Sequence, residues 1–269
     1  FHIPDYFLSD ISDTDERARY EYDDGWMLII LRIPYVKEVR SRTPYTTVPL
    51  GIIHKRDVTI TVCYYETNMM IDFVSYQQKR REGFTDYVDL IFRLFLSSAV
   101  WYLKRLKQIS ALIEKAKHNL DQGVNNESLI GLSRLQDSLT YFITSIRGNE
   151  NLLQKLKFKL QVDELDADLI EDVSIEMTQA RETTSIYSDI LESTMETYSS
   201  IINNNMNTVM RTLTSVSIIM MFPTLISSLF GMNLVNGMES SPFGFAIALI
   251  ISVVVSGASW WILRYKRLL

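Results

Sequence analysis

The residues best suited to chemistry form a polar stripe along a mostly apolar stretch, residues 209–230. A seven-residue repeat continued through this stretch places a carboxamide, hydroxyls and thioethers on one side, with the large aliphatic residues mostly elsewhere. The stripe consists of Asn207, Met210, Thr214, Ser217, Met221, Thr224, Ser228 and Gly231. It indicates either a water-filled path inside an oligomer or dry packing of small residues between helices. Asn207, at one end, favours the water-filled path.

A second set of residues is strongly acidic and has no Lys or Arg within it. Its members are Asp163, Glu164, Asp166, Asp168, Glu171, Asp172 and Glu176. A charge run of this kind usually forms a solvated helix face. In a ring of identical subunits, however, the same carboxylates would repel one another, and divalent cations would relieve that repulsion.

Composition and missing motifs count against several other functions. The net charge of −5 does not indicate the basic surface that nucleic-acid binding usually needs. Cys63 is the only cysteine, and the three histidines follow no metal-ligand spacing. No Gly-rich phosphate loop, H-E-x-x-H or G-x-S-x-G motif occurs. We therefore expect no enzyme, no organic cofactor and no nucleic-acid partner, with the soluble part in the cytosol.

Two stretches are long and apolar enough for a lipid bilayer, which needs about 20 helical residues. They are residues 209–230, with a single Arg near the start, and residues 243–263, which carry no charge. The tail, residues 264–269, is basic, whereas the loop at residues 231–242 carries only Glu239. The positive-inside rule predicts a protein of the cell (inner) membrane with both termini in the cytosol.

The elements before the spans change from strands to helices. Gly25–Tyr35 and Gly51–Glu66 are rich in β-branched and aromatic residues, and "HKRD" in the second predicts a hairpin turn. We expect a partial α/β domain over residues 1–68, with an N-terminal portion missing because the chain opens without Met. A helical hairpin follows over residues 69–164, with its second helix from Glu127 to about Arg147.

A single long helix is predicted over residues 165–230. No glycine occurs between Gly148 and Gly231, and the only proline there is Pro223. Such a helix reaches about 100 Å at 1.5 Å per residue. Its apolar residues recur at coiled-coil-like intervals and call for partner helices. Because two spans per chain cannot enclose a path, transport requires several copies in a ring.

The stretch "LFGMNLVNGMES" resembles the Gly-Met-Asn signature of the CorA family of magnesium transporters, directly after the first of two C-terminal spans. The likeness extends over nearly the whole chain. It implies an α+β cytosolic domain with a long helical hairpin and a stalk helix, followed by two transmembrane helices. It further implies a funnel-shaped homopentamer that passes magnesium, or alternatively cobalt or nickel, across the bilayer.

The resemblance also implies roles for individual residues. Asn233 would ring the outer entrance, with Gly231 and Met232 shaping the turn. Neutral carboxamides suit an ion that dehydrates reluctantly. Glu239 would concentrate cations at the mouth. The pore-lining and gating positions map onto Asn207, Leu213, Met221 and Thr224, whereas the seven-residue repeat favours Thr214 over Leu213.

For regulation, the resemblance implies magnesium bound between subunits. The matching positions are Asp10 in "YFLSDI" and Asp172 in "IEDV", with Glu171 and Glu176 as helpers. Occupied sites would close the ring when cytosolic magnesium is high, and vacant sites would loosen it.

Two alternatives stay open. The loop "VNGMES" departs from the usual "M-P-E-L" pattern, as the loop of the zinc-handling ZntB relatives does, so zinc is a possible substrate. In another class, a membrane-anchored scaffold or sensor would need neither the polar stripe nor the Gly-Met-Asn turn.

Overall fold

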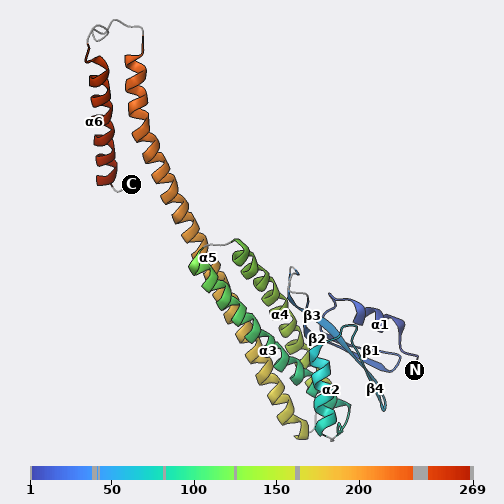
Figure 1. The fold of residues 1–269 in the computed structure, drawn as a ribbon. Helices are drawn as coiled ribbons and strands as arrows, with labels where there is room; N and C mark the ends of the chain where they lie inside the picture. Colours follow the sequence, from blue (N-terminus) through green and yellow to red (C-terminus); the bar gives the residue numbers. More distant parts are fainter. Residues whose placement is uncertain are drawn as a thin grey trace. The chain divides into compact units, whose positions relative to one another are not determined.

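The computed structural model describes residues 2–37, 41, 43–80, 83–123, 126–160, 164–232 and 242–266, with the side chains of residues 80 and 164–166 left aside. The chain forms two compact units, residues 1–196 and 197–269. Their boundary falls inside the longest helix, α5 (Glu164–Phe230), drawn in yellow to orange in Figure 1. Each unit is described separately below.

The first unit opens with helix α1 (Asp5–Ser12) and a four-stranded antiparallel sheet in the order β1-β2-β3-β4. The strands are β1 (Arg19–Asp23), β2 (Trp26–Val36), β3 (Tyr45–Lys55) and β4 (Val58–Val62). Both predicted strand segments are present, and the turn falls within "HKRD" as expected. Strand β1 was not predicted. It pairs with β2 through a turn in which Asp24 and Gly25 both have positive φ (48° and 75°), so "DG" was an available hairpin signal.

Helix α1 covers one face of the sheet. Phe7 and Ile11 are fully buried and pack with Trp26, Leu28, Ile30 and Ile53. The helix approaches β3 so closely that a Cβ on Gly51 would lie 2.2 Å from Cδ1 of Ile11. Any larger residue would force the buried Ile11 side chain to shift.

Helices α3 (Tyr87–Gln122) and α4 (Asn126–Lys159) contact β2 and β3, and α2 (Asn68–Arg80) packs beside α3. Strand side chains alternate between the two faces, so the burial of every residue from Trp26 to Pro34 shows that both faces of β2 are covered. The fully buried Tyr102 of α3 stacks edge-on against Phe142 of α4, with 5.1 Å between ring centroids. Helix α3 begins at a capped end, where Asp86 accepts from the Asp89 N–H at 2.9 Å.

Helix α4 is longer than the predicted second helix, which was expected to end near Arg147. It continues through Gly148 to Lys159 because Asn149, Leu152, Leu153 and Leu156 are all buried. Tertiary burial thus outweighs the low helix propensity of glycine.

The first part of α5 runs antiparallel to α4. Lys157 Nζ donates to Ser174 Oγ at 3.0 Å, and the Arg181 and Glu150 side chains pair at 3.2 Å. Farther along, Gln136 donates to Ser188 Oγ at 2.9 Å. One stripe of α5 is buried at spacings of three, four and seven: Ile170, Val173, Met177, Ala180, Thr184 and Leu191. The expected need for partner helices is met on this face by helices of the same chain.

The second unit contains the rest of α5 and helix α6 (Gly244–Tyr265). Pro223 lies inside α5 and has no N–H to offer the carbonyl of Ile219 four residues earlier. Ser256 Oγ of α6 donates to that carbonyl at 3.4 Å. The hydroxyl therefore replaces the missing helical bond and joins the two helices at the level of the proline.

Candidate functional site

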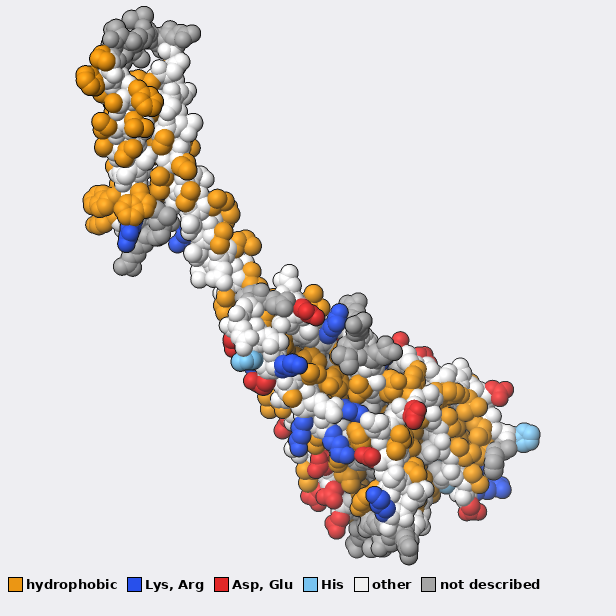
Figure 2. All heavy atoms as spheres, viewed as in Figure 1, with side chains coloured by type: hydrophobic (Ala, Val, Ile, Leu, Met, Phe, Trp, Pro, Cys, Tyr) orange, Lys and Arg blue, Asp and Glu red, His pale blue; other side chains and the backbone are white. Residues whose placement is uncertain are grey.

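Two helices are long and apolar enough to cross a membrane. Ala167–Phe230 contains a window with a mean hydropathy of 1.8, and Gly244–Tyr265 reaches 2.2. Only 6% of each window is buried, so these are not core helices of the folded chain. Figure 2 shows hydrophobic side chains spread over the surfaces of α6 and the last part of α5. Trp260, Trp261 and Tyr265 are exposed at one end of α6, as expected for an interfacial belt.

The polar stripe lies on the side of α5 that faces away from α6. The α6-facing positions are Ser215, which is buried, Ile219, which accepts from Ser256, and the half-buried Phe222 and Ile226. At 100° per residue, the stripe is centred about 150° around the helix from these four residues. Met210, Thr214, Ser217, Met221, Thr224 and Ser228 are all exposed. Packing against α6 therefore does not account for the stripe.

Three hydroxyls of the stripe present oxygen lone pairs rather than hydrogens. Thr214 donates its hydroxyl to the Met210 carbonyl and Ser217 to the Leu213 carbonyl, both at 2.8 Å. Thr224 donates to the Met220 carbonyl at 3.1 Å. Each hydrogen is committed to the backbone, so the oxygen is left to accept. A surface of acceptors suits a hydrated cation, whose waters point their hydrogens outward.

The other predicted pore residues lie on the same helix or beyond its end. Asn207 and Leu213 are exposed on α5, with Leu213 showing 60% of its surface. Gly231 donates its N–H to the Ser227 carbonyl at 2.9 Å, which extends the helical bonding past Phe230. Gly231 and Met232 are exposed. Asn233 and Glu239 lie outside the described residues.

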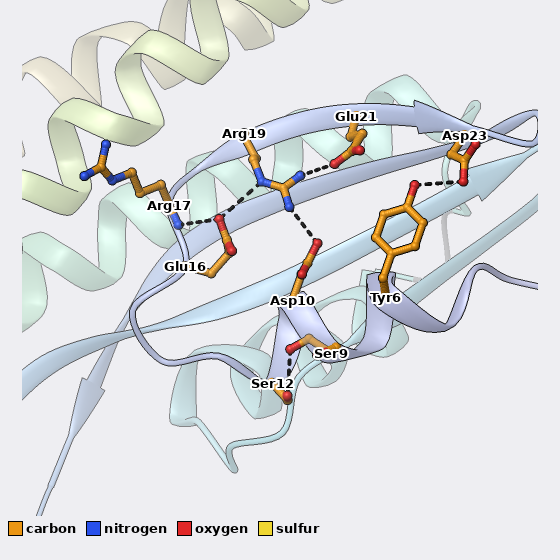
Figure 3. Close-up of polar contacts among 9 residues, drawn as sticks. All are labelled: Tyr6, Ser9, Asp10, Ser12, Glu16, Arg17, Arg19, Glu21 and Asp23. Atoms are coloured by element: carbon orange, nitrogen blue, oxygen red, sulfur yellow. Dashed lines mark hydrogen bonds and ion pairs between the residues drawn. The ribbon is translucent and has the colours of Figure 1, made fainter.

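The predicted regulatory residues differ in their surroundings. Asp172 and Glu171 are exposed on α5, whereas Glu176 is half-buried. Asp10, on α1, accepts from Arg19 Nη2 of β1 at 2.6 Å (Figure 3). Within the described part of one chain, no group of three His, Cys, Asp or Glu side chains is arranged to hold a metal ion.

Arg19 is a residue that sequence reasoning missed. Besides Asp10, its guanidinium pairs with Glu16, at 3.2 Å from Nε, and with Glu21. Burial lowers the pKa of Arg19, but the hydrogen bonds and charges of Glu16 and Glu21 outweigh it and raise that pKa. An available signal was the isolation of Arg17 and Arg19 in a stretch of acids, Asp10 to Asp24.

A cavity of about 590 Å³ lies between α2 and α3, in the first unit. Its lining carries the cations Lys79, Arg93 and Lys104 and one carboxylate, Asp72, but no His or Cys. The lining therefore carries more positive than negative charge.

Comparisons with known proteins agree with these features. A family model described as CorA-like Mg²⁺ transporter protein matches residues 1–267. The cobalt/magnesium transport protein CorA of Methanocaldococcus jannaschii is 26% identical over 249 residues, or 90% of this chain and 77% of that protein. The magnesium transport protein CorA of Helicobacter pylori is 24% identical over 71% of this chain and 62% of its own length. The chain thus spans less than two thirds of that relative.

Solved structures show the same fold. The complete structure of the CorA magnesium transporter from M. jannaschii superposes with a TM-score of 0.82 at 25% identity, covering 97% of this chain and 83% of that one. The ZntB cytoplasmic domain from Vibrio parahaemolyticus gives a TM-score of 0.57 at 15% identity over 76% of this chain and 79% of that one, which shows the fold alone. These likenesses confirm the expected α+β domain with long helices and two C-terminal candidate spans. The chain therefore belongs to the family of CorA-like Mg²⁺ transporter proteins.

Proposed function

We propose that this chain is one subunit of a homopentameric, channel-type transporter for divalent cations, with magnesium as the main substrate. The observation that carries the proposal is the polar stripe of α5, which faces away from α6 and presents acceptor oxygens. Several copies with these stripes turned toward a common axis would form a path lined by oxygen and thioether groups. The names of the M. jannaschii and H. pylori relatives, as transporters of cobalt or magnesium, support the choice of substrate.

Along this path, each residue class has a physical role. A ring of Asn233 carboxamides hydrogen-bonds the hydrated ion at the outer entrance without stripping its waters, which magnesium releases reluctantly. Glu239 raises the local cation concentration at the mouth. Leu213 and Met221 form an apolar constriction that closes by excluding water, and Thr224 and Asn207 supply oxygens on either side. Both termini lie in the cytosol, on the side of the basic tail.

The proposal includes regulation by cytosolic magnesium bound between subunits. Asp10 of one subunit and Asp172 of its neighbour hold the ion, with Glu171 and Glu176 close to Asp172 in sequence. The exposure of Asp172 and Glu171 on α5 supports this, because these two carboxylates are accessible to a second copy. A bound ion stabilises the closed ring by mass action.

The test of transport is ion flux into proteoliposomes, measured with magnesium, cobalt, nickel and zinc in turn. Asn233→Ala should reduce magnesium flux at least tenfold, while the oligomer stays intact by size-exclusion chromatography. Asn236→Ala is the matched control, since it removes the same carboxamide from the same loop outside the Gly-Met-Asn signature. Wild-type flux in a stable Asn233→Ala protein would refute the entrance ring. Flux with zinc but with none of the other metals would favour the ZntB-like alternative, in which zinc is the substrate. An absence of flux with every metal would favour a membrane-anchored scaffold or sensor.

A further inference from the structure

Arg19 connects three carboxylates that come from different parts of the first unit. Nη2 pairs with Asp10 of α1 at 2.6 Å, Nε with Glu16 of the connecting loop at 3.2 Å, and Nη1 with Glu21 on the same strand. Figure 3 shows the guanidinium at the centre of this group, with each of the three edges directed at one carboxylate. Arg19 therefore supplies a cation to Asp10 from within the same chain.

The arrangement around Arg19 is anchored to the fold rather than free at the surface. Glu16 also accepts from the Arg17 N–H at 3.0 Å, and its carbonyl accepts from Nη1 of Arg32 at 3.0 Å. Arg32 is buried with 7% of its surface exposed, and it donates further to Thr14 and Thr47. The guanidinium of Arg19 is thus held on its Glu16 side by a group fixed to the sheet, so its contact with Asp10 is preorganised.

Two cations compete for one carboxylate when they cannot both approach it closely. A magnesium ion at Asp10 would lie within a few ångströms of the Arg19 guanidinium, where like charges repel. Binding therefore requires the ion to displace Nη2 from Asp10, and the free energy of that ion pair is subtracted from the affinity for the ion. Glu16 and Glu21 keep Arg19 nearby after displacement, which preserves the competition.

We propose that Arg19 is a built-in competitor that sets the magnesium concentration at which Asp10 is occupied. This inference rests on the regulatory part of the proposed function and makes no statement about the ion path. Arg19 keeps the regulatory site vacant until magnesium is high enough to displace it. A chain without Arg19 at this position would respond at a lower concentration.

The test measures protection of the full-length oligomer from protease as magnesium is raised. Arg19→Gln should lower the midpoint about threefold to fivefold, the range that matches a partly exposed ion pair. Arg19→Lys keeps the charge and should give a midpoint between those of Arg19→Gln and the wild type. The matched control is Arg17→Gln, which makes the same change of charge two residues away. In Figure 3 the Arg17 side chain points away from Asp10. Circular dichroism checks that each variant is folded.

The Asp10→Asn background assigns the effect to Asp10. If Arg19 acts through that carboxylate, Arg19→Gln should cause no further shift in Asp10→Asn protein. The inference is overturned if Arg19→Gln and Arg17→Gln shift the midpoint equally, or if the shift survives in Asp10→Asn. Protection of Arg19→Gln without protection of the wild type would support it, and protection of neither would overturn it. Magnesium flux of the wild type and of Asn233→Ala is measured in parallel. A failure of this inference is therefore distinguishable from a failure of the proposed transport.

Discussion

At the scale of single residues, Asn149 completes the sheet where β1 ends. Strand β1 pairs with β2 only as far as Ile30, and Arg32 lies opposite Pro49 on β3. The fully buried Asn149 accepts from the Arg32 N–H at 2.9 Å and donates to the Arg32 carbonyl at 2.7 Å. The Asn149 side chain thus makes the two backbone hydrogen bonds that a residue of a neighbouring strand would make, and it links α4 to β2.

Asn149→Ala should therefore destabilise the first unit. The Arg32 carbonyl keeps a partner, since Tyr102 Oη donates to it at 3.1 Å, but the buried Arg32 N–H loses its acceptor. We expect a loss of about 1–3 kcal/mol in the free energy of unfolding, measured by urea denaturation in detergent. Asn151→Ala, two residues on and exposed, should change it by less than about 0.5 kcal/mol. Equal effects of the two substitutions would contradict this role for Asn149.

The sequence offered a signal that Arg19 lies among acids, but the particular partners of Asn149 and Arg19 could not be predicted, for one physical reason. Asn149 and Arg32 are separated by 117 residues. The local sequence does not distinguish an exposed asparagine in a helix from one whose side chain bonds to the backbone of a strand. Asp10, by contrast, was singled out from a short motif, but the pattern did not reveal that Arg19 pairs with it. Contacts between side chains of different elements depend on packing, which local sequence does not specify.

At the scale of elements, the two long helices were the most predictable part of the chain. The expected helix at residues 165–230 corresponds to α5 (Glu164–Phe230). A long run without glycine and with regularly spaced apolar residues strongly favours a helix over other secondary structure. The expected span at residues 243–263 likewise corresponds to α6 (Gly244–Tyr265). Strand β1 was missed because it is short and mostly polar, with residues that are half-buried or exposed, and its place in the sheet comes from pairing with β2.

The proposal that the polar stripe of α5 lines the ion path can be tested with one hydroxyl. Thr224→Val keeps the side-chain volume but removes an acceptor oxygen from the polar stripe, so magnesium flux should fall about fivefold if roughly 1 kcal/mol is lost at the barrier. Thr212 is also exposed and bonded to the carbonyl four residues earlier, but it lies about 120° around the helix from Thr224. Thr212→Val should leave the proteoliposome flux unchanged. The reverse order of effects would place the path on another face.

At the scale of the whole molecule, the proposed regulation needs at least two copies of the chain, because the proposal places its two ligands on neighbouring subunits. Wild-type protein should become more resistant to protease as magnesium rises through the millimolar range, on the order expected of a weak carboxylate site. Asp172→Asn should give a smaller response or a higher midpoint, since the bound ion loses one charge. Asp189→Asn, an exposed carboxylate farther along α5, is the control and should follow the wild type. An unchanged midpoint in Asp172→Asn would move the sensor elsewhere in the acidic run.

The hydroxyls of α5 that bond to their own backbone also bear on how the oligomer is made. A newly synthesised chain enters the bilayer alone, before any neighbour can shield its polar side chains. The hydroxyl hydrogens of Thr214, Ser217 and Thr224 are already satisfied within the helix, and Ser256 serves the carbonyl that Pro223 leaves unpaired. Exposure of these three hydroxyls to lipid therefore costs less than exposure of hydroxyls without a hydrogen-bond partner. If the chain assembles as proposed, membrane insertion of one copy and assembly of several copies can therefore be separate steps.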